Sequence, residues 1–263
     1  MLEIVLVLSL LFLIFTFFYK QAIHEFRIHQ WDADASLQET LYDRSKERIP
    51  VVLRKLPRMG VWSQEDVLQR DCYARLPLFQ EYGIQEWLRQ ATSDSICPWR
   101  YEQAETLAKV STLSIWEKQW LRPLLFPTVL SFSSPLSHWS QIPRFHCWAG
   151  RVPLRKTFAM WTCILPVEGE IVVTLLPESM ELFLPSGWNR TFPSEWTKRD
   201  TPFVADIKYL DVVVRPGTGL FMPPHWFVSW GAKEAGKAPM VCTVSYHSPV
   251  SLLAFHLAGH SRD

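Results

Sequence analysis

The hydrophobic pattern is densest between residues 212 and 230, where short apolar runs alternate with turn residues. The Val-Val-Val run at residues 212–214 is typical of a strand covered on both faces. Pro216-Gly217 suits the centre of a type II turn, because proline presets φ and glycine accepts a positive φ. Residues 220–222 resume a strand, a Pro-Pro pair stiffens the next corner, and residue 226 begins another strand. The pattern predicts part of a small β-barrel or sandwich.

Shorter patterns predict the remaining elements. Helices are expected where a capping residue or a turn signal bounds a run of helical spacing, at residues 36–48, 63–69, 78–91, 112–121 and 250–257. Strands are expected at residues 49–54, 144–149, 158–165, 171–176, 181–184 and 240–247, the last with clean alternation. Residues 186–206 are polar and rich in aromatic residues, and we interpret them as an insertion that covers the mouth of the barrel.

Residues 4–19 form an apolar run with almost no polar side chains on any face. We expect residues 1–20 to be an uncleaved transmembrane anchor. A bilayer span needs about 20 apolar residues, and the start lacks the basic residues and cleavage site of a signal peptide. A cleaved signal and a buried helix are the alternatives. Glu3 precedes the run whereas Lys20 and Arg27 follow it, so the positive-inside rule predicts a cytosolic C-terminal domain.

Composition narrows the classes of function. The chain has 27 Lys and Arg against 26 Asp and Glu, and without a basic stripe nothing supports nucleic-acid binding. Its five cysteines show neither a C-x-x-C nor a zinc-ligand spacing. We interpret them as buried free thiols in a reducing compartment. Asn189-Arg190-Thr191 is a glycosylation sequon, which would matter only if the domain were lumenal.

Residues 49–246 resemble a JmjC/cupin-like domain of the iron and 2-oxoglutarate oxygenases, most specifically from residue 147 to residue 230. IPVVLR, followed by Trp62, is similar to the opening strand of such domains. The hairpin at residues 214–230 keeps the scaffold of x-PGD-x-L-φ-hP-x-x-W-W-H, in which φ and h are apolar. The resemblance implies a mainly β fold with a helical shell (α+β), built on a double-stranded β-helix of the jelly-roll or cupin type.

The resemblance also locates the positions of the family's iron ligands. In active members, the pattern G-x-x-x-T-P-L-H-x-D supplies a histidine and an aspartate, and the hairpin supplies a second histidine. Here Arg155 and Thr157 stand at the first two positions and Val228 at the third. Glu168 stands where the asparaginyl-hydroxylase branch has the lysine that binds 2-oxoglutarate. Because a guanidinium cannot coordinate a divalent cation, we expect no metal and no cofactor.

Few histidines in the sequence could replace the missing iron ligands. None of the eight histidines is followed two residues later by an acid. His225 lies three residues before Val228, and an odd offset on a strand points a side chain to the opposite face, so a rim or capping role is favoured over metal ligation. His146 and His247 are interpreted as core or rim histidines with hydrogen-bond partners.

Arg155 and Lys156 are adjacent, so their side chains are expected on opposite faces of a strand. An inward-facing Arg155 is expected to pair with Glu168. The alternative is an anion site, in which Arg155 holds the carboxylate or phosphate of a small ligand.

These features predict three parts: an anchor at residues 1–20, a juxtamembrane helical linker at residues 21–48 and a JmjC/cupin-like domain at residues 49–258. The domain would comprise a helical shell (49–140), a barrel (141–248) and a closing helix (249–258). The expected function is a non-catalytic interaction or ligand-binding module on a membrane, with an unknown protein partner. The alternatives are an Fe(II)/2-oxoglutarate hydroxylase with unconventional ligands, a metal-independent cupin-type isomerase with His146, His225 or His247 as base, and a structural protein without a pocket.

Overall fold

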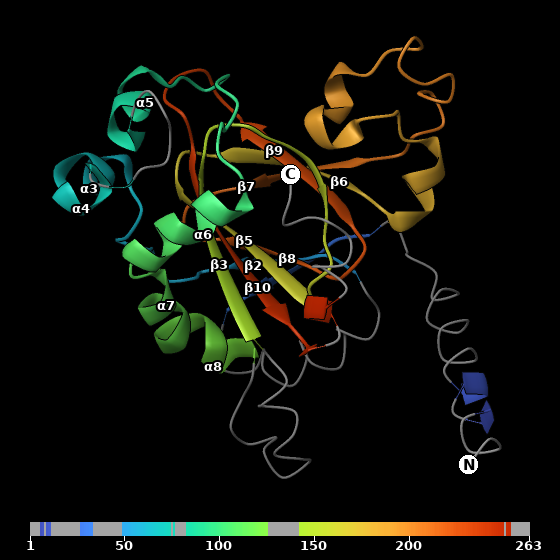
Figure 1. The fold of residues 1–263 in the computed structure, drawn as a ribbon, viewed down its shortest axis with the longest axis horizontal. Helices are drawn as coiled ribbons and strands as arrows, with labels where there is room; N and C mark the ends of the chain where they lie inside the picture. Colours follow the sequence, from blue (N-terminus) through green and yellow to red (C-terminus); the bar gives the residue numbers. More distant parts are fainter. Residues whose placement is uncertain are drawn as a thin grey trace.

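Two β-sheets and several helices make up the computed structural model of the chain, which is an α+β fold. Figure 1 shows helices α3–α8 gathered along one side of the sheets. The structure describes residues 6–7, 9–11, 27–33, 49–74, 76, 83–125, 142–249 and 251–253.

The larger sheet has the strand order β1-β2-β8-β5-β10-β3, and the smaller sheet has the order β4-β9-β6-β7. From β3 onward, successive strands alternate between the sheets, except that β6 and β7 are neighbours in the smaller one. All pairings are antiparallel except that of β1 with β2. The strands are β1 (His29–Asp32), β2 (Val51–Arg54), β3 (Ile142–Ala149), β4 (Val152–Lys156), β5 (Trp161–Glu168), β6 (Ile171–Leu176), β7 (Leu210–Val214), β8 (Gly219–Met222), β9 (Phe227–Ala232) and β10 (Met240–His247).

Helical elements make up much of the described chain between β2 and β3. The longest, α6, packs against β3 through Ala104, Leu107 and Ala108. The helical elements of this region are α3 (Gln64–Gln69), α4 (Asp71–Ala74), α5 (Ile84–Gln90), α6 (Tyr101–Val110), α7 (Leu113–Trp116), the π-helical turn η2 (Glu117–Leu121) and α8 (Arg122–Leu125). This arrangement agrees with the predicted helical shell, although α6 itself was not predicted because its buried face consists largely of alanine.

The predicted turn between β7 and β8 is confirmed. The Thr218 amide donates to the Arg215 carbonyl at 2.9 Å, and Gly217 has a φ of +85°. Strands β6 and β10 match the predicted ranges, and β9 begins one residue later than predicted. The turn and the Pro-Pro corner thus set the direction of three successive strands.

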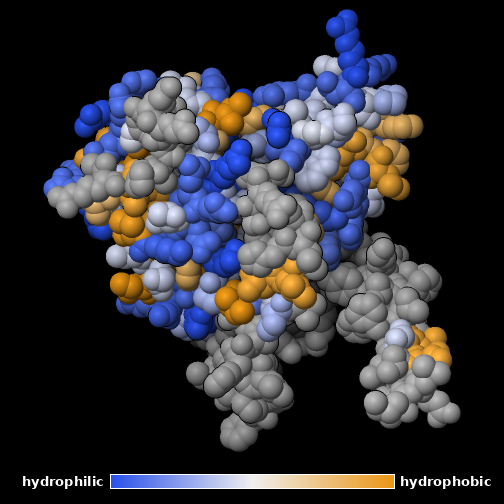
Figure 2. Space-filling model, in the orientation of Figure 1, coloured by the Kyte–Doolittle hydropathy of each residue, from blue (hydrophilic) through white to orange (hydrophobic). Residues whose placement is uncertain are grey.

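The predicted strand at residues 181–184 is wrong. Residues 178–183 form the 3-10 helix η4 (Glu178–Phe183), flanked by Pro177 and by η5 (Trp188–Arg190) and η6 (Pro193–Glu195) farther along. Leu182 is 90% exposed, so its side chain has no sheet surface to pack against. Figure 2 shows hydrophobic side chains on the outer surface of this insertion.

β1 lies in the segment predicted to be a helical linker, which is a second correction. Its residues pair in parallel with β2, from His29 opposite Val51 to Asp32 opposite Arg54. The predicted helix at residues 36–48 lies outside the described residues, as do most of residues 1–20 and 250–257. Among the helices that the structure describes, none combines the length and the apolar character needed to cross a bilayer.

Candidate functional site

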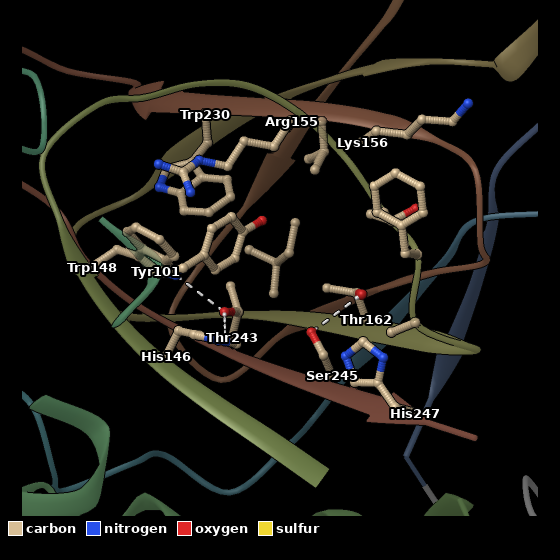
Figure 3. Close-up of a pocket in the computed structure, with 15 residues that line it drawn as sticks. Tyr101, His146, Trp148, Arg155, Lys156, Thr162, Trp230, Thr243, Ser245 and His247 are labelled. Atoms are coloured by element: carbon tan, nitrogen blue, oxygen red, sulfur yellow. Dashed lines mark hydrogen bonds between the residues drawn. The ribbon is translucent and has the colours of Figure 1, made fainter. Parts of the chain in front are cut away.

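A small cavity lies between the two sheets, and Arg155, Thr157 and Val228 all line it. The resemblance assigns these three residues to the iron-ligand positions, so the sequence correctly predicted that they converge. The cavity holds about 40 Å³, which is room for a few water molecules. In Figure 3, Thr243, Ser245 and His247 of β10 face Arg155 of β4 across this space.

Arg155 occupies much of the upper wall of this cavity. Its Cα pairs directly with that of Val228 across β4 and β9. The guanidinium carbon lies 4.5 Å from the ring centroids of both Tyr101 and Trp148. Such stacking over aromatic faces stabilises a cation that has left bulk water. Nε is buried without a hydrogen-bond partner, so the aromatic contacts leave part of the guanidinium's hydrogen-bonding capacity unused.

Lys156 is among the residues that line the cavity, but its ammonium extends away from it, opposite to the side chain of Arg155. Its ammonium lies 2.7 Å from a Glu181 carboxylate oxygen and 3.5 Å from one of Glu178. The prediction that Arg155 and Lys156 occupy opposite faces is therefore confirmed.

Thr157 uses its hydroxyl to hold the corner between β8 and β9. The oxygen lies 3.0 Å from the Pro223 carbonyl and 3.1 Å from that of Trp226, either of which accepts its proton. It also accepts from the Trp226 amide at 3.1 Å. Because the hydroxyl already forms hydrogen bonds with these backbone groups, it has little capacity left to coordinate a metal.

Glu168 is not the partner of Arg155, which corrects the sequence prediction. Its carboxylate accepts from the Gln64 amide at 2.7 Å, and no ion pair joins it to Arg155 in the part of the chain that the structure describes. Glu168 is the last residue of β5, so its side chain lies at the end of this strand, beside the first residue of α3. Unsatisfied amides at a helix start attract such an acceptor.

His225 also lies outside the cavity lining, as expected for a rim position. It has a φ of +69° in the corner after β8, and its amide donates to the Thr157 carbonyl at 2.7 Å. Its Nδ1 is 3.8 Å from a Glu178 oxygen. This placement agrees with the predicted rim role of His225.

His146 and His247 both line the cavity and are buried, with 3% exposure each. His146 Nδ1 is 3.5 Å from the Thr243 hydroxyl, and His247 Nδ1 is 3.5 Å from that of Ser251. Burial lowers the pKa of His146 to about 3, with a smaller contribution from nearby cations, Arg155 among them. A base with so low a pKa is mismatched to proton abstraction at neutral pH.

Sequence reasoning missed several residues of the cavity. Thr243 and Ser245 alternate with apolar residues along β10, so the alternation itself was a usable signal for a polar inward face. Tyr101 comes from the first turn of α6 and reaches the cavity only through tertiary packing. Nothing in its local sequence indicates that placement.

The donor set does not fit the iron centre that the resemblance implies. Facial coordination needs two imidazoles and a carboxylate, whereas a guanidinium, an engaged hydroxyl and a valine stand at those positions. Within the described ranges, no group of three or more His, Cys, Asp or Glu side chains is arranged to hold a metal ion.

Comparison with known proteins adds no assignment: no protein-family model and no curated protein matches this chain.

Proposed function

We propose that the chain is a membrane-anchored protein whose folded domain is a double-stranded β-helix of the JmjC/cupin type. In this proposal the domain is a pseudo-oxygenase that binds a ligand or partner without catalysis. The strand order supports the fold, because β8-β5-β10-β3 faces β4-β9-β6-β7. Eight antiparallel strands shared between two sheets in this way are typical of jelly rolls and cupins.

The main support for a loss of oxygenase chemistry is that Arg155, Thr157 and Val228 line the same cavity. Their positions agree with those of a metal cage, but their chemistry does not. Arg155 places a permanent cation where a divalent metal would bind, and the two charges would repel each other. The active-hydroxylase alternative would therefore need ligands from elsewhere in the chain.

The isomerase alternative is weaker. His146 lies beside the Thr243 hydroxyl in the cavity, and its lowered pKa makes it a poor base. His225 faces Glu178 at the rim instead.

A purely structural role is the stronger second candidate, and one observation favours it. The interior holds only about 40 Å³, less than a small-molecule site usually offers.

The membrane part of the proposal rests on the apolar run at residues 4–19. Full-length protein expressed in cells should remain in the membrane pellet after alkaline carbonate extraction, and a variant lacking residues 1–20 should not. Release of the full-length chain by carbonate would contradict the anchor but would leave the domain assignment intact.

The catalytic part is tested by incubating purified protein aerobically with Fe(II), ascorbate and 2-oxoglutarate and measuring succinate. Succinate formation should equal that of a protein-free control. Fe(II)-dependent succinate above this background would support the hydroxylase alternative and contradict the proposal.

A further inference from the structure

A second and larger cavity adjoins the interior one. It holds about 390 Å³, within the range of about 300–1,000 Å³ that is common for small-molecule sites. Arg155 and Tyr101 line both cavities, so they form the wall between them. The lining residues are Cys97, Pro98, Trp99, Arg100, Tyr101, Arg155, Trp188, Asn189 and Arg190.

All the charged side chains that line this larger cavity are basic. Arg100, Arg155 and Arg190 line it, and no Asp or Glu does. Elsewhere in the domain, basic side chains such as Lys156 and Arg151 are paired with carboxylates at 2.7 and 2.6 Å. Arg155 has neither an ion pair nor a hydrogen bond in the part of the chain that is described, and its Nε is buried. A partly buried cation without a counter-charge is costly, and an external anion would offset that cost.

The cavity walls are held in place before any ligand arrives. The Leu154 amide of β4 donates to the Thr191 carbonyl at 3.1 Å, which ties the end of η5 to the strand that carries Arg155. The Trp188 ring packs edge-on against Phe227, with 5.0 Å between ring centroids. The Trp196 indole donates to the Thr191 hydroxyl at 2.8 Å. Such preorganisation reduces the ordering that binding would otherwise require.

We propose that this cavity binds a small organic oxyanion, a carboxylate or a phosphate monoester. Its anionic group would pair with Arg155 and Arg190, and its organic part would lie against Trp188 and Tyr101. Guanidinium groups bind both kinds of oxyanion through paired N–H donors, and the aromatic walls favour an organic over an inorganic anion. This inference deepens the proposed function and rests on it, because it names the ligand class of the same non-catalytic module.

The test is isothermal titration calorimetry of the purified full chain with phenyl phosphate, benzoate, inorganic phosphate and the neutral analogue benzamide. Saturable binding of phenyl phosphate or benzoate is expected, with benzamide and inorganic phosphate at least about ten-fold weaker. The tighter of the two aromatic anions identifies the class of anionic group. Absence of saturable binding by both aromatic anions at millimolar concentrations, or benzamide binding as tightly as the better of them, would overturn the inference.

Substitutions of three arginines test whether binding takes place in this cavity. Arg155→Met should weaken binding of the aromatic anion by about ten-fold or more, whereas Arg215→Met should bind as the wild type does, because Arg215 pairs with Glu170 and does not line the cavity. Arg190→Gln, a change at an exposed position, should weaken binding several-fold and remains informative if Arg155→Met fails to fold. Unchanged affinity in Arg190→Gln and in any folded Arg155→Met protein would overturn the inference. That result is independent of succinate formation, which tests the proposed function itself.

Discussion

The Thr157 hydroxyl lies within hydrogen-bond distance of both the backbone amide and the backbone carbonyl of Trp226. The Trp226 amide donates to the hydroxyl oxygen at 3.1 Å, and the Trp226 carbonyl lies 3.1 Å from the same oxygen. A residue at a position that would carry an iron ligand in the resembling family thus holds the corner between β8 and β9. The hydroxyl is therefore part of the structural framework at this corner.

Thr157→Val should therefore destabilise the protein by about 1–3 kcal/mol, because the buried Trp226 amide loses its acceptor. Thr157→Ser keeps the hydroxyl and loses one methyl group, and should cost about 1 kcal/mol. Urea unfolding followed by tryptophan fluorescence measures both. A Val variant as stable as the wild type would show that the hydroxyl contributes nothing to the corner.

Gly150 should tolerate no side chain. It has a φ of +80°, and an added Cβ would overlap the Ser95 carbonyl oxygen. Gly150→Ala combines backbone strain with overpacking and should cost about 3 kcal/mol. Gly187→Ala is the matched control, because its φ is +75° but nothing lies near the added Cβ; about 1 kcal/mol is expected. Equal losses in thermal or urea unfolding would refute the role of close packing at Gly150.

His146 should make stability depend on pH in the acidic range. Its pKa falls from 6.5 to about 3 on folding, so the unfolded state binds a proton that the folded state does not. The contribution is fully present above pH 6.5 and is lost as pH falls towards 3, at about 1.4 kcal/mol per pH unit. Between pH 6 and 4.5, the urea midpoint should fall more steeply for the wild type than for His146→Gln. Parallel pH profiles for the two proteins would contradict the buried neutral imidazole.

One thiol should react quickly in the folded protein. Cys72 is exposed, whereas Cys97, Cys147, Cys163 and Cys242 are buried, so the prediction of burial is wrong at one position. The Sγ atoms of Cys147 and Cys242 are 3.7 Å apart across β3 and β10, and burial raises the pKa of Cys242. Thiol titration with an aromatic disulfide should give one fast equivalent that Cys72→Ser removes, and four more after unfolding. A fast phase that persists in Cys72→Ser would show that one of the four other thiols is accessible in the folded protein.

The framework of the two sheets was predictable because its signals are local. The β-branched residues of β6, the alternation of β10 and the Pro-Gly turn each indicate one structure from a few neighbouring residues. Convergence of Arg155 with Val228 followed from the resemblance, and their direct pairing across two strands explains it.

The site's contacts were less predictable because they join distant parts of the chain. Tyr101 reaches Arg155 from a helix whose small buried residues give a weak pattern. The expected partner of Arg155, Glu168, is instead bound by the Gln64 amide, 104 residues away in the sequence. Charge complementarity favoured Arg155 as the partner of Glu168, but the actual partner depends on how the end of β5 meets α3.

Our central proposal is that Arg155, Thr157 and Val228, the positions that correspond to iron ligands in the resembling family, do not bind a divalent metal. Mn(II), an oxygen-insensitive substitute for Fe(II), gives a six-line electron paramagnetic resonance signal when free in solution. With one equivalent of the purified chain and excess 2-oxoglutarate, we expect the free Mn(II) signal to keep its full amplitude. Stoichiometric loss of that signal, reversed in Thr157→Val, would contradict the account.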